Sequence, residues 1–82
     1  MKATILVRPK EGILDPQGKA VESSLRHLGF PVGDARVGRV IDLEVDAPSV
    51  GEARVQLEQM CERLLTNPLI ESYEIKLEEK GG

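Results

Sequence analysis

The sequence predicts an α+β protein in which two helices lie on one face of a small, mostly antiparallel sheet. Three segments alternate apolar and polar residues with the period of two that is typical of half-buried strands. Two segments between them repeat apolar residues at the spacing of an amphipathic helix. The resulting order is strand, helix, strand, helix, strand, which favours a two-layer sandwich.

The first strand and the first helix have clear boundaries. Residues 2–8 alternate in character, and Pro9 ends the run. The helix is expected over residues 16–28, because Asp15 can cap its first turn and Pro16 suits the first helical position. One buried stripe is expected on this helix, and Gly29 can close it in a left-handed conformation. The stripe consists of Val21, Leu25 and Leu28.

The central strand is clear at its end but not at its beginning. Residues 40–46 alternate cleanly, whereas continuing the pattern backwards places Arg39 on the apolar face. Either Gly38 marks a bulge or bend in one strand over residues 35–46, or Arg39 faces a partner. The alternative is a short hairpin with residues 35–37 and 40–46 as separate strands.

The second helix begins at Ser49, where Ser49-Val50-Gly51-Glu52 forms a capping box, and is expected to end near residues 66–68. Its expected apolar face consists of Ala53, Leu57, Met60, Cys61 and Leu64. The last strand places Tyr73, Ile75 and Leu77 on one face, and a polar tail over residues 78–82 is expected to fray. If the central strand splits at Gly38, the architecture is related to the ferredoxin-like arrangement.

Size and charge narrow the classes of function. The 82 residues are expected to form one domain, residues 1–82, that is too small for a large private active-site cavity. The stability margin of so short a chain is small, so association with other subunits is expected. The net charge of −3, with scattered basic residues and two aromatic ones, argues against binding of nucleic acid. No apolar run reaches the length of a membrane span and no signal peptide is evident, so a cytoplasmic location is expected. A single cysteine agrees with a reducing compartment.

The side chains that could carry chemistry are few. Cys61 lies on the predicted apolar face without a base beside it, and His27 has no second ligand at metal-binding spacing. We therefore expect no catalytic residue, no metal site and no cofactor. Arg36 and Arg39 could bind a carboxylate or a phosphate. Charges that protect the edge of a strand against aggregation explain these two residues almost as well.

Three blocks of sequence resemble one family. The segment Leu14-Asp15-Pro16-Gln17-Gly18-Lys19-Ala20-Val21 resembles the signature of PurS, the small subunit of bacterial and archaeal phosphoribosylformylglycinamidine synthase. The segment Asp34-Ala35-Arg36-Val37-Gly38-Arg39 is similar to a second block of that family, with arginine at position 39 where lysine is expected in many relatives. A third block comprises Met60 to Leu65, Asn67-Pro68 and Ile70 to Tyr73.

The resemblance implies a PurS-like fold and a role in purine biosynthesis. An ATP-dependent ligase there converts formylglycinamide ribonucleotide to formylglycinamidine ribonucleotide with ammonia from glutamine. The implied partners are the PurL synthetase subunit and the PurQ glutaminase subunit, which PurS bridges as a dimer without being a catalyst, helping ammonia to move between them. A homodimer or a tetramer is implied. Candidate interface residues are Asp15, Gln17, Lys19, Arg36 and Arg39.

A second reading of the same residues is a regulatory module that binds a small ligand. Two-helix sandwiches often bind metabolites where subunits meet, so this alternative depends on fold-level analogy alone.

Overall fold

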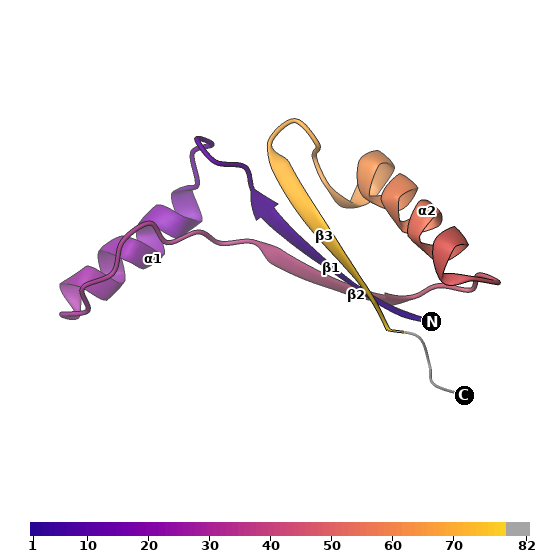
Figure 1. The fold of residues 1–82 in the computed structure, drawn as a ribbon. Helices are drawn as coiled ribbons and strands as arrows, with labels where there is room; N and C mark the ends of the chain where they lie inside the picture. The colour runs from indigo at the N-terminus through magenta and orange to yellow at the C-terminus, as the bar shows by residue number, and fades with distance from the viewer. Residues whose placement is uncertain (79–82) are drawn as a thin grey trace.

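The computed structural model describes residues 1–78 and confirms the α+β class and the order of elements (Figure 1). The elements are β1 (Lys2–Pro9), α1 (Pro16–His27), β2 (Arg39–Glu44), α2 (Val50–Met60) and β3 (Glu71–Glu78). A π-helical segment, η1 (Cys61–Leu65), continues α2 directly. The expected fraying of the tail falls largely on residues 79–82, which lie outside the described residues.

The three strands form one antiparallel sheet in the order β2-β1-β3. Ile5, at the centre of β1, pairs with Ile41 on one side and Ile75 on the other. Side chains alternate between the two faces of a sheet, so one face carries the apolar residues and is here called the core face. The opposite face, here called the open face, carries mainly polar residues such as Thr4 and Asp42, whose side chains are hydrogen-bonded at 2.8 Å.

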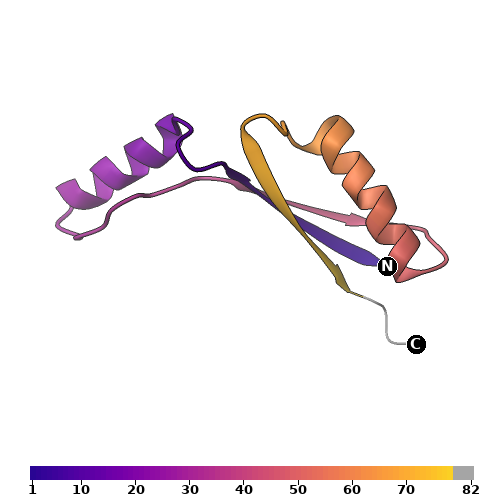
Figure 2. The same cartoon turned by 45° about the horizontal axis from the view of Figure 1, so that its top comes forward.

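Helix α2 lies along the core face and forms the hydrophobic core with it (Figures 1 and 2). The Ser49 hydroxyl accepts a hydrogen bond of 3.2 Å from the N–H of Glu52, so this part of the capping box is confirmed. The buried apolar side chains come from β1, α2, η1 and the residue after β2. They are Ala3, Ile5, Val7, Val45, Ala53, Leu57 and Cys61.

The predicted apolar face of the second helix is wrong for its last residue, Leu64. Ala53, Leu57 and Cys61 are buried as predicted, but Leu64 is 83% exposed. The hydrogen bonds of a π-helix join residues five apart, so η1 adds a residue to the turn and rotates Leu64 away from the sheet. The helix then ends at Thr66, whose N–H and hydroxyl both donate to the carbonyl oxygen of Cys61.

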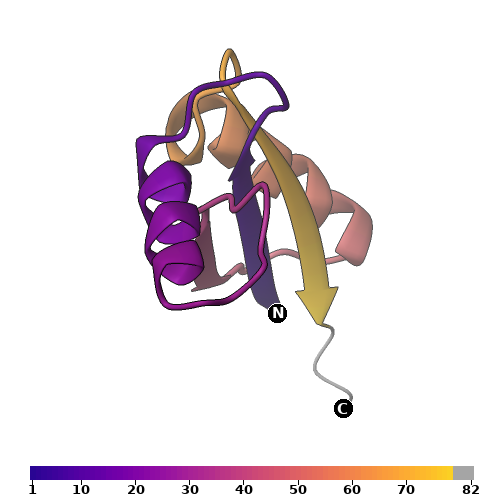
Figure 3. The ribbon, with the colours of Figure 1, turned by 90° about the vertical axis from the view of Figure 1, so that its left-hand side faces the viewer.

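Helix α1 does not lie on the sheet, in contrast to the expected arrangement of both helices on one face. Figures 1 and 2 show it standing apart beyond one end of the strands, and Figure 3 views it from its outer side. Helix α1 makes no extensive contact with any other helix or strand of residues 1–78. The reason is local, because residues 30–37 run back alongside α1 and do not turn it onto the sheet. Helix α1 and residues 30–37 are here together called the arm. Amphipathic spacing predicts that a stripe is apolar but not which surface covers it.

The arm makes the molecule long. Its dimensions are 50 × 29 × 14 Å, and the Cα radius of gyration is 16.2 Å, whereas a compact chain of this length has a radius of about 12 Å. The predicted stripe on α1 is consequently not buried, since Val21 is 42% exposed and Leu28 is 72% exposed.

Both ends of α1 are nevertheless formed as predicted. Asp15 caps the first turn. Gly29 adopts a φ of 98°, and the N–H groups of Gly29 and Phe30 donate to the carbonyls of Arg26 and Leu25, which is a Schellman motif.

The beginning of the central strand differs from both alternatives. Strand β2 starts at Arg39, directly after Gly38. Residues 35–37 are neither part of a bent strand nor a separate hairpin strand, because their N–H groups bond to the arm instead. Ala35 donates to Glu22 at 3.4 Å and Val37 donates to Asp15 at 2.8 Å.

Candidate functional site

Asp15 joins the two segments of the arm at its base. One carboxylate oxygen accepts a hydrogen bond of 3.0 Å from the N–H of Gly18, and the other accepts one of 2.8 Å from the N–H of Val37. The first bond caps α1, as the sequence predicts. The second fastens the start of α1 to the segment that enters β2, 22 residues further along the chain. A single carboxylate therefore fixes the base of the arm.

The two backbone donors stabilise the charged form of Asp15. The hydrogen bonds from Val37 and then Gly18 hold the pKa of the Asp15 carboxyl below its usual value, with the nearby guanidinium of Arg36 adding to the effect. A carboxyl whose pKa is lowered by folding stabilises the folded state above its unfolded pKa, and that contribution is lost as the pH falls through the folded pKa.

The free energy of unfolding is expected to rise as the Asp15 carboxyl ionises between about pH 2 and 5. Asp15→Asn is expected to reduce this rise, because asparagine has one acceptor oxygen where the carboxylate has two. The measurement is the urea midpoint of the parent and the variant at several pH values in this range. Asp34→Asn is a matched control at the same junction, because the Asp34 carboxylate accepts neither of these bonds. Parallel pH profiles of the parent and Asp15→Asn would contradict this role.

Two glycines allow close backbone approaches at this junction, one within the arm and one between residue 38 and β1. A Cβ atom on Gly18 would lie 2.2 Å from the carbonyl oxygen of Ala35, and one on Gly38 would lie 2.1 Å from the carbonyl oxygen of Val7. Both distances are far below van der Waals contact. Arg36 adds a third link, because its guanidinium donates to the carbonyl oxygen of Pro9 at the end of β1.

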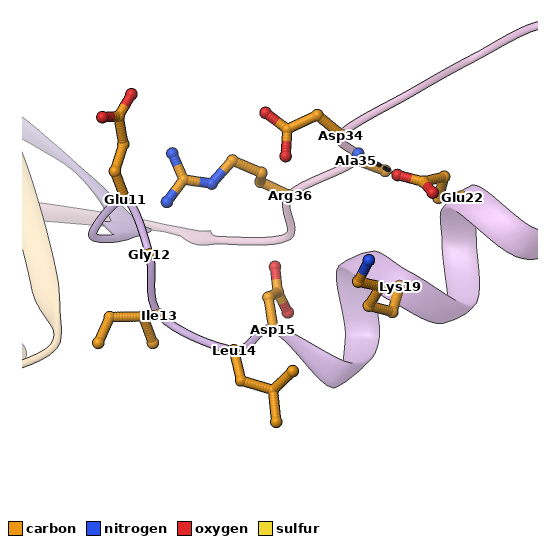
Figure 4. A pocket seen from close by; sticks show the side chains of 10 residues that line it. All are labelled: Glu11, Gly12, Ile13, Leu14, Asp15, Lys19, Glu22, Asp34, Ala35 and Arg36. Carbon is orange, nitrogen blue, oxygen red and sulfur yellow. Dashed lines mark hydrogen bonds between the residues drawn. The ribbon is translucent and has the colours of Figure 1, made fainter.

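A hollow of about 500 Å³ opens beside this junction (Figure 4). Its rim is formed by the β1–α1 loop, the first half of α1 and the segment that leads to β2, and the Arg36 side chain points toward the β1–α1 loop. The lining includes Glu11, Asp15, Lys19, Glu22, Asp34 and Arg36. Acidic groups outnumber basic ones, so the hollow suits a polar protein surface better than a phosphate.

The predicted interface residues do not all share this hollow. Asp15, Lys19 and Arg36 line it, whereas Gln17 lines a neighbouring depression of about 250 Å³ together with Arg39. Gln17 and Lys19 are exposed on the first turns of α1. Asp15 is only half-exposed, and both of its carboxylate oxygens accept internal hydrogen bonds.

Arg39 is held by its own chain. Its guanidinium forms a two-pronged ion pair with Glu71, at 2.6 and 3.1 Å, and donates to the carbonyl oxygen of Leu65 at 2.6 Å. The hydrogen bonds from Arg39 and from the N–H of Asn67 hold the pKa of Glu71 below its usual value. Arg39 thus occupies the core face because it ties β2 to the end of η1 and to β3.

Cys61 and His27 gain no catalytic role from the structure. Cys61 is fully buried, and burial followed by the nearby Glu62 raises the pKa of its thiol, which disfavours the reactive thiolate. His27 is exposed at the end of α1. Within residues 1–78, no group of three His, Cys, Asp or Glu side chains is placed to hold a metal ion. The helices in this part of the chain are too short or too polar to cross a membrane.

The sequence reasoning missed a set of exposed apolar side chains. They lie in the loops beside the junction, at the end of the arm and on η1. They include Leu14, Leu28, Phe30, Leu64 and Leu69. Leu14 and Leu69 stand in turn-rich segments between elements, where a large apolar residue is itself a signal of contact with another surface.

Comparison with known proteins assigns this chain to a family. The profile described as "PurS: Phosphoribosylformylglycinamidine (FGAM) synthase" matches residues 2–79. The FGAM synthase subunit PurS of Methanocaldococcus jannaschii is 35% identical over 79 residues, which cover 95% of each chain. The PurS subunit of Bacillus subtilis is 38% identical over 79 residues, covering 95% of this chain and 93% of that one.

Solved structures have the same fold. Bacillus subtilis PurS superposes with a TM-score of 0.85 at 38% identity, covering 95% of this chain and 98% of that chain. A chain in the structure of PurLQS from Thermotoga maritima gives a TM-score of 0.84 at 38% identity, with coverage of 92% and 93%. The chain therefore belongs to the PurS family and is a PurS subunit of FGAM synthase, which acts in purine biosynthesis.

Proposed function

We propose that this chain is a non-catalytic subunit that associates with the PurL synthetase and the PurQ glutaminase, bridges them, and supports the transfer of ammonia between them. The Thermotoga maritima structure is named for an assembly of PurL, PurQ and PurS, and it contains a chain with this fold. The assembly of that relative supports the proposed partners of this chain.

The observation that carries the proposal is the free-standing arm. A helix with an apolar stripe normally buries that stripe, yet α1 has no element of residues 1–78 packed on it, and Leu28 and Phe30 at its far end are 72% and 54% exposed. Exposed apolar groups rimmed by charge are typical of protein interfaces. The arm thus offers a large subunit both an apolar stripe and the charged junction at its base.

The direct test of assembly is sizing chromatography of the purified chain mixed with its cognate PurL and PurQ subunits. Glutamine and ADP are included, and other nucleotides are tried in turn. We expect the three proteins to elute together under at least one of these conditions. Failure to co-elute under every nucleotide condition would contradict the proposal.

Gln17→Ala is expected to lower the glutamine-dependent rate of the assembled synthase more than the rate with added ammonia, because only the former requires ammonia transfer between subunits. Gln17 is exposed beside the junction, and Arg36→Ala is a second variant at the same place. Gln56→Ala, an equally polar change on the exposed side of α2, is the matched control. Equal losses of both rates would show that these residues merely support the fold.

Self-association belongs to the same proposal. A homodimer or a tetramer would cover part of the apolar surface that an elongated 82-residue chain leaves exposed. A cytoplasmic location is also proposed, and the single cysteine of the sequence agrees with a reducing compartment.

A further inference from the structure

We propose that the β1–α1 loop and the hollow beside it dock a cationic loop of the PurL–PurQ assembly. Leu14 is the apolar anchor of this surface, and the carboxylates of Glu11 and Asp34 receive a lysine or arginine side chain of the partner. The inference rests on the proposed association with those subunits and deepens it, because it names the docking residues and the chemistry of the partner surface.

The β1–α1 loop is fixed at both of its ends. The N–H of Ile13 donates to the carbonyl oxygen of Lys10 at 3.2 Å, and Gly12 between them has a φ of 81°, which is the arrangement of a type II β-turn. At the other end of the loop, Asp15 accepts two backbone hydrogen bonds. A loop that is already ordered loses little conformational entropy when a partner binds it.

Leu14 is an exposed apolar side chain for which the helix offers no apolar partner. It directly precedes the helix cap, a position whose apolar side chain commonly packs on the fourth residue of the helix in a hydrophobic staple. That fourth residue is Lys19, so the staple has no apolar second half. The Leu14 side chain is 77% exposed, and it is therefore available to a second protein surface.

A neighbouring loop extends this apolar surface. The N–H of Lys10 donates to the carbonyl oxygen of Ile70 at 2.9 Å, which holds the loop before β3 beside the β1–α1 loop. Ile13, Leu14 and Ile70 line one depression, and the first two of them also border the charged hollow. Apolar side chains next to a charged rim have the composition of a protein interface.

The hollow contains two carboxylates that the chain itself does not use. Asp15 and Glu22 accept hydrogen bonds from backbone N–H groups. Glu11 and Asp34, by contrast, take part in none of the side-chain hydrogen bonds and ion pairs found within residues 1–78. Figure 4 shows these two side chains at the rim of the hollow. Each can accept a charged hydrogen bond from a partner.

The charge of the hollow selects a cation. Its lining holds four acidic side chains and two basic ones, and one of the basic ones, Arg36, already donates to the carbonyl oxygen of Pro9. An arriving lysine or arginine therefore meets an excess of negative charge, whereas a carboxylate would be repelled. A second copy of this chain has a net charge of −3, so a cationic loop of another subunit is the better complement.

Two variants test the two halves of this surface. Leu14→Ala removes the anchor, and Glu11→Gln combined with Asp34→Asn removes the charges at nearly constant shape. Each is expected to raise at least about tenfold the concentration of the chain that gives the half-maximal glutamine-dependent rate with PurL and PurQ. Sizing chromatography of the same mixtures follows the assembly directly.

Matched controls lie on the exposed side of α2. Val55→Ala and Glu58→Gln make the same kinds of change at exposed positions away from the hollow, and they are expected to change the half-maximal concentration less than about twofold. Asparagine tolerates the φ of 50° at position 34 as aspartate does. The urea midpoints of all variants are therefore expected to match that of the parent.

Salt and charge reversal separate a charged contact from a general loss of shape. The parent is expected to need a higher half-maximal concentration as ionic strength rises, and the variant without the two carboxylates is expected to lose much of this dependence. Glu11→Lys is expected to weaken assembly more than Glu11→Gln, because it places a cation against the partner's cation.

The inference is overturned if the parent assembles and the Leu14 and carboxylate variants reach half-maximal rate at the parental concentration. It is also overturned if they weaken only the association of the chain with itself, measured by sedimentation velocity. Failure of the parent to co-elute with PurL and PurQ under any nucleotide condition is a different result. It contradicts the proposed function, and this inference with it.

Discussion

Gly38→Ala is expected to lower the free energy of unfolding by about 2–3 kcal/mol. The new Cβ would lie 2.1 Å from the carbonyl oxygen of Val7, with the Val7 carbonyl carbon and the Arg8 Cα also within 3.3 Å. All three are backbone atoms of β1, the middle strand of the sheet, and moving them would disturb the pairing of β1 with both of its neighbours. Relief by a side-chain rotation is therefore impossible.

Gly51→Ala is the matched control for this effect. Gly51 lies in the first turn of α2, and the nearest atom to a new Cβ there is the Ser49 hydroxyl oxygen at 4.0 Å. This variant is expected to be as stable as the parent or up to about 1 kcal/mol more stable, because alanine favours a helix over glycine. Urea unfolding followed by circular dichroism compares the two, and an unchanged midpoint for Gly38→Ala would show that the strands tolerate the shift.

Leu57→Ala is expected to cost about 2–4 kcal/mol, the largest effect of any single truncation in α2. The Leu57 side chain is fully buried in the core cluster, which also includes residues of β1, so its removal loses apolar contacts and leaves a cavity. Leu64→Ala makes the same chemical change at a side chain that is 83% exposed, and it is expected to change the unfolding free energy by less than about 0.5 kcal/mol.

The comparison of Leu57 with Leu64 is measured by thermal or urea unfolding of the two variants under identical conditions. Equal losses would mean that η1 returns to regular α-helical geometry and buries Leu64 after all. A large loss of assembly with PurL and PurQ in Leu64→Ala, at unchanged stability, would place η1 in an interface.

The same pair of leucines shows how far the sequence predicts the fold. The strands, the caps and the core face of α2 follow from local periodicity and hydrogen-bonding residues, which act over a few positions. Leu64 follows Leu57 by seven residues and therefore shares its face on a regular helix. One inserted residue in a π-helical turn has no sequence signal of that kind, so the exposure of Leu64 was not predictable.

The position of α1 required information that periodicity does not hold. Val21, Leu25 and Leu28 specify an apolar stripe, but the surface that covers the stripe depends on the path of residues 30–37. Arg39 illustrates the opposite case. Its place on the apolar face was visible in the sequence, whereas its reason, the ion pair with Glu71 and the bond to Leu65, joins residues far apart in the chain.

The candidate site was predicted in part. Asp15 was expected to cap α1, and it does. Its second bond, to Val37, and the close contacts of Gly18 with Ala35 and of Gly38 with Val7 were not expected, because they join residues far apart in the chain.

The free-standing arm also sets how cooperative the molecule is. An isolated helix of about 12 residues is only marginally stable in water, and α1 gains little from the sheet because it is joined to it mainly through its base. The arm can therefore open and re-form as a unit of its own while the sheet stays folded. A subunit that packs on the arm would supply the missing stability locally, so binding and the ordering of α1 become one event.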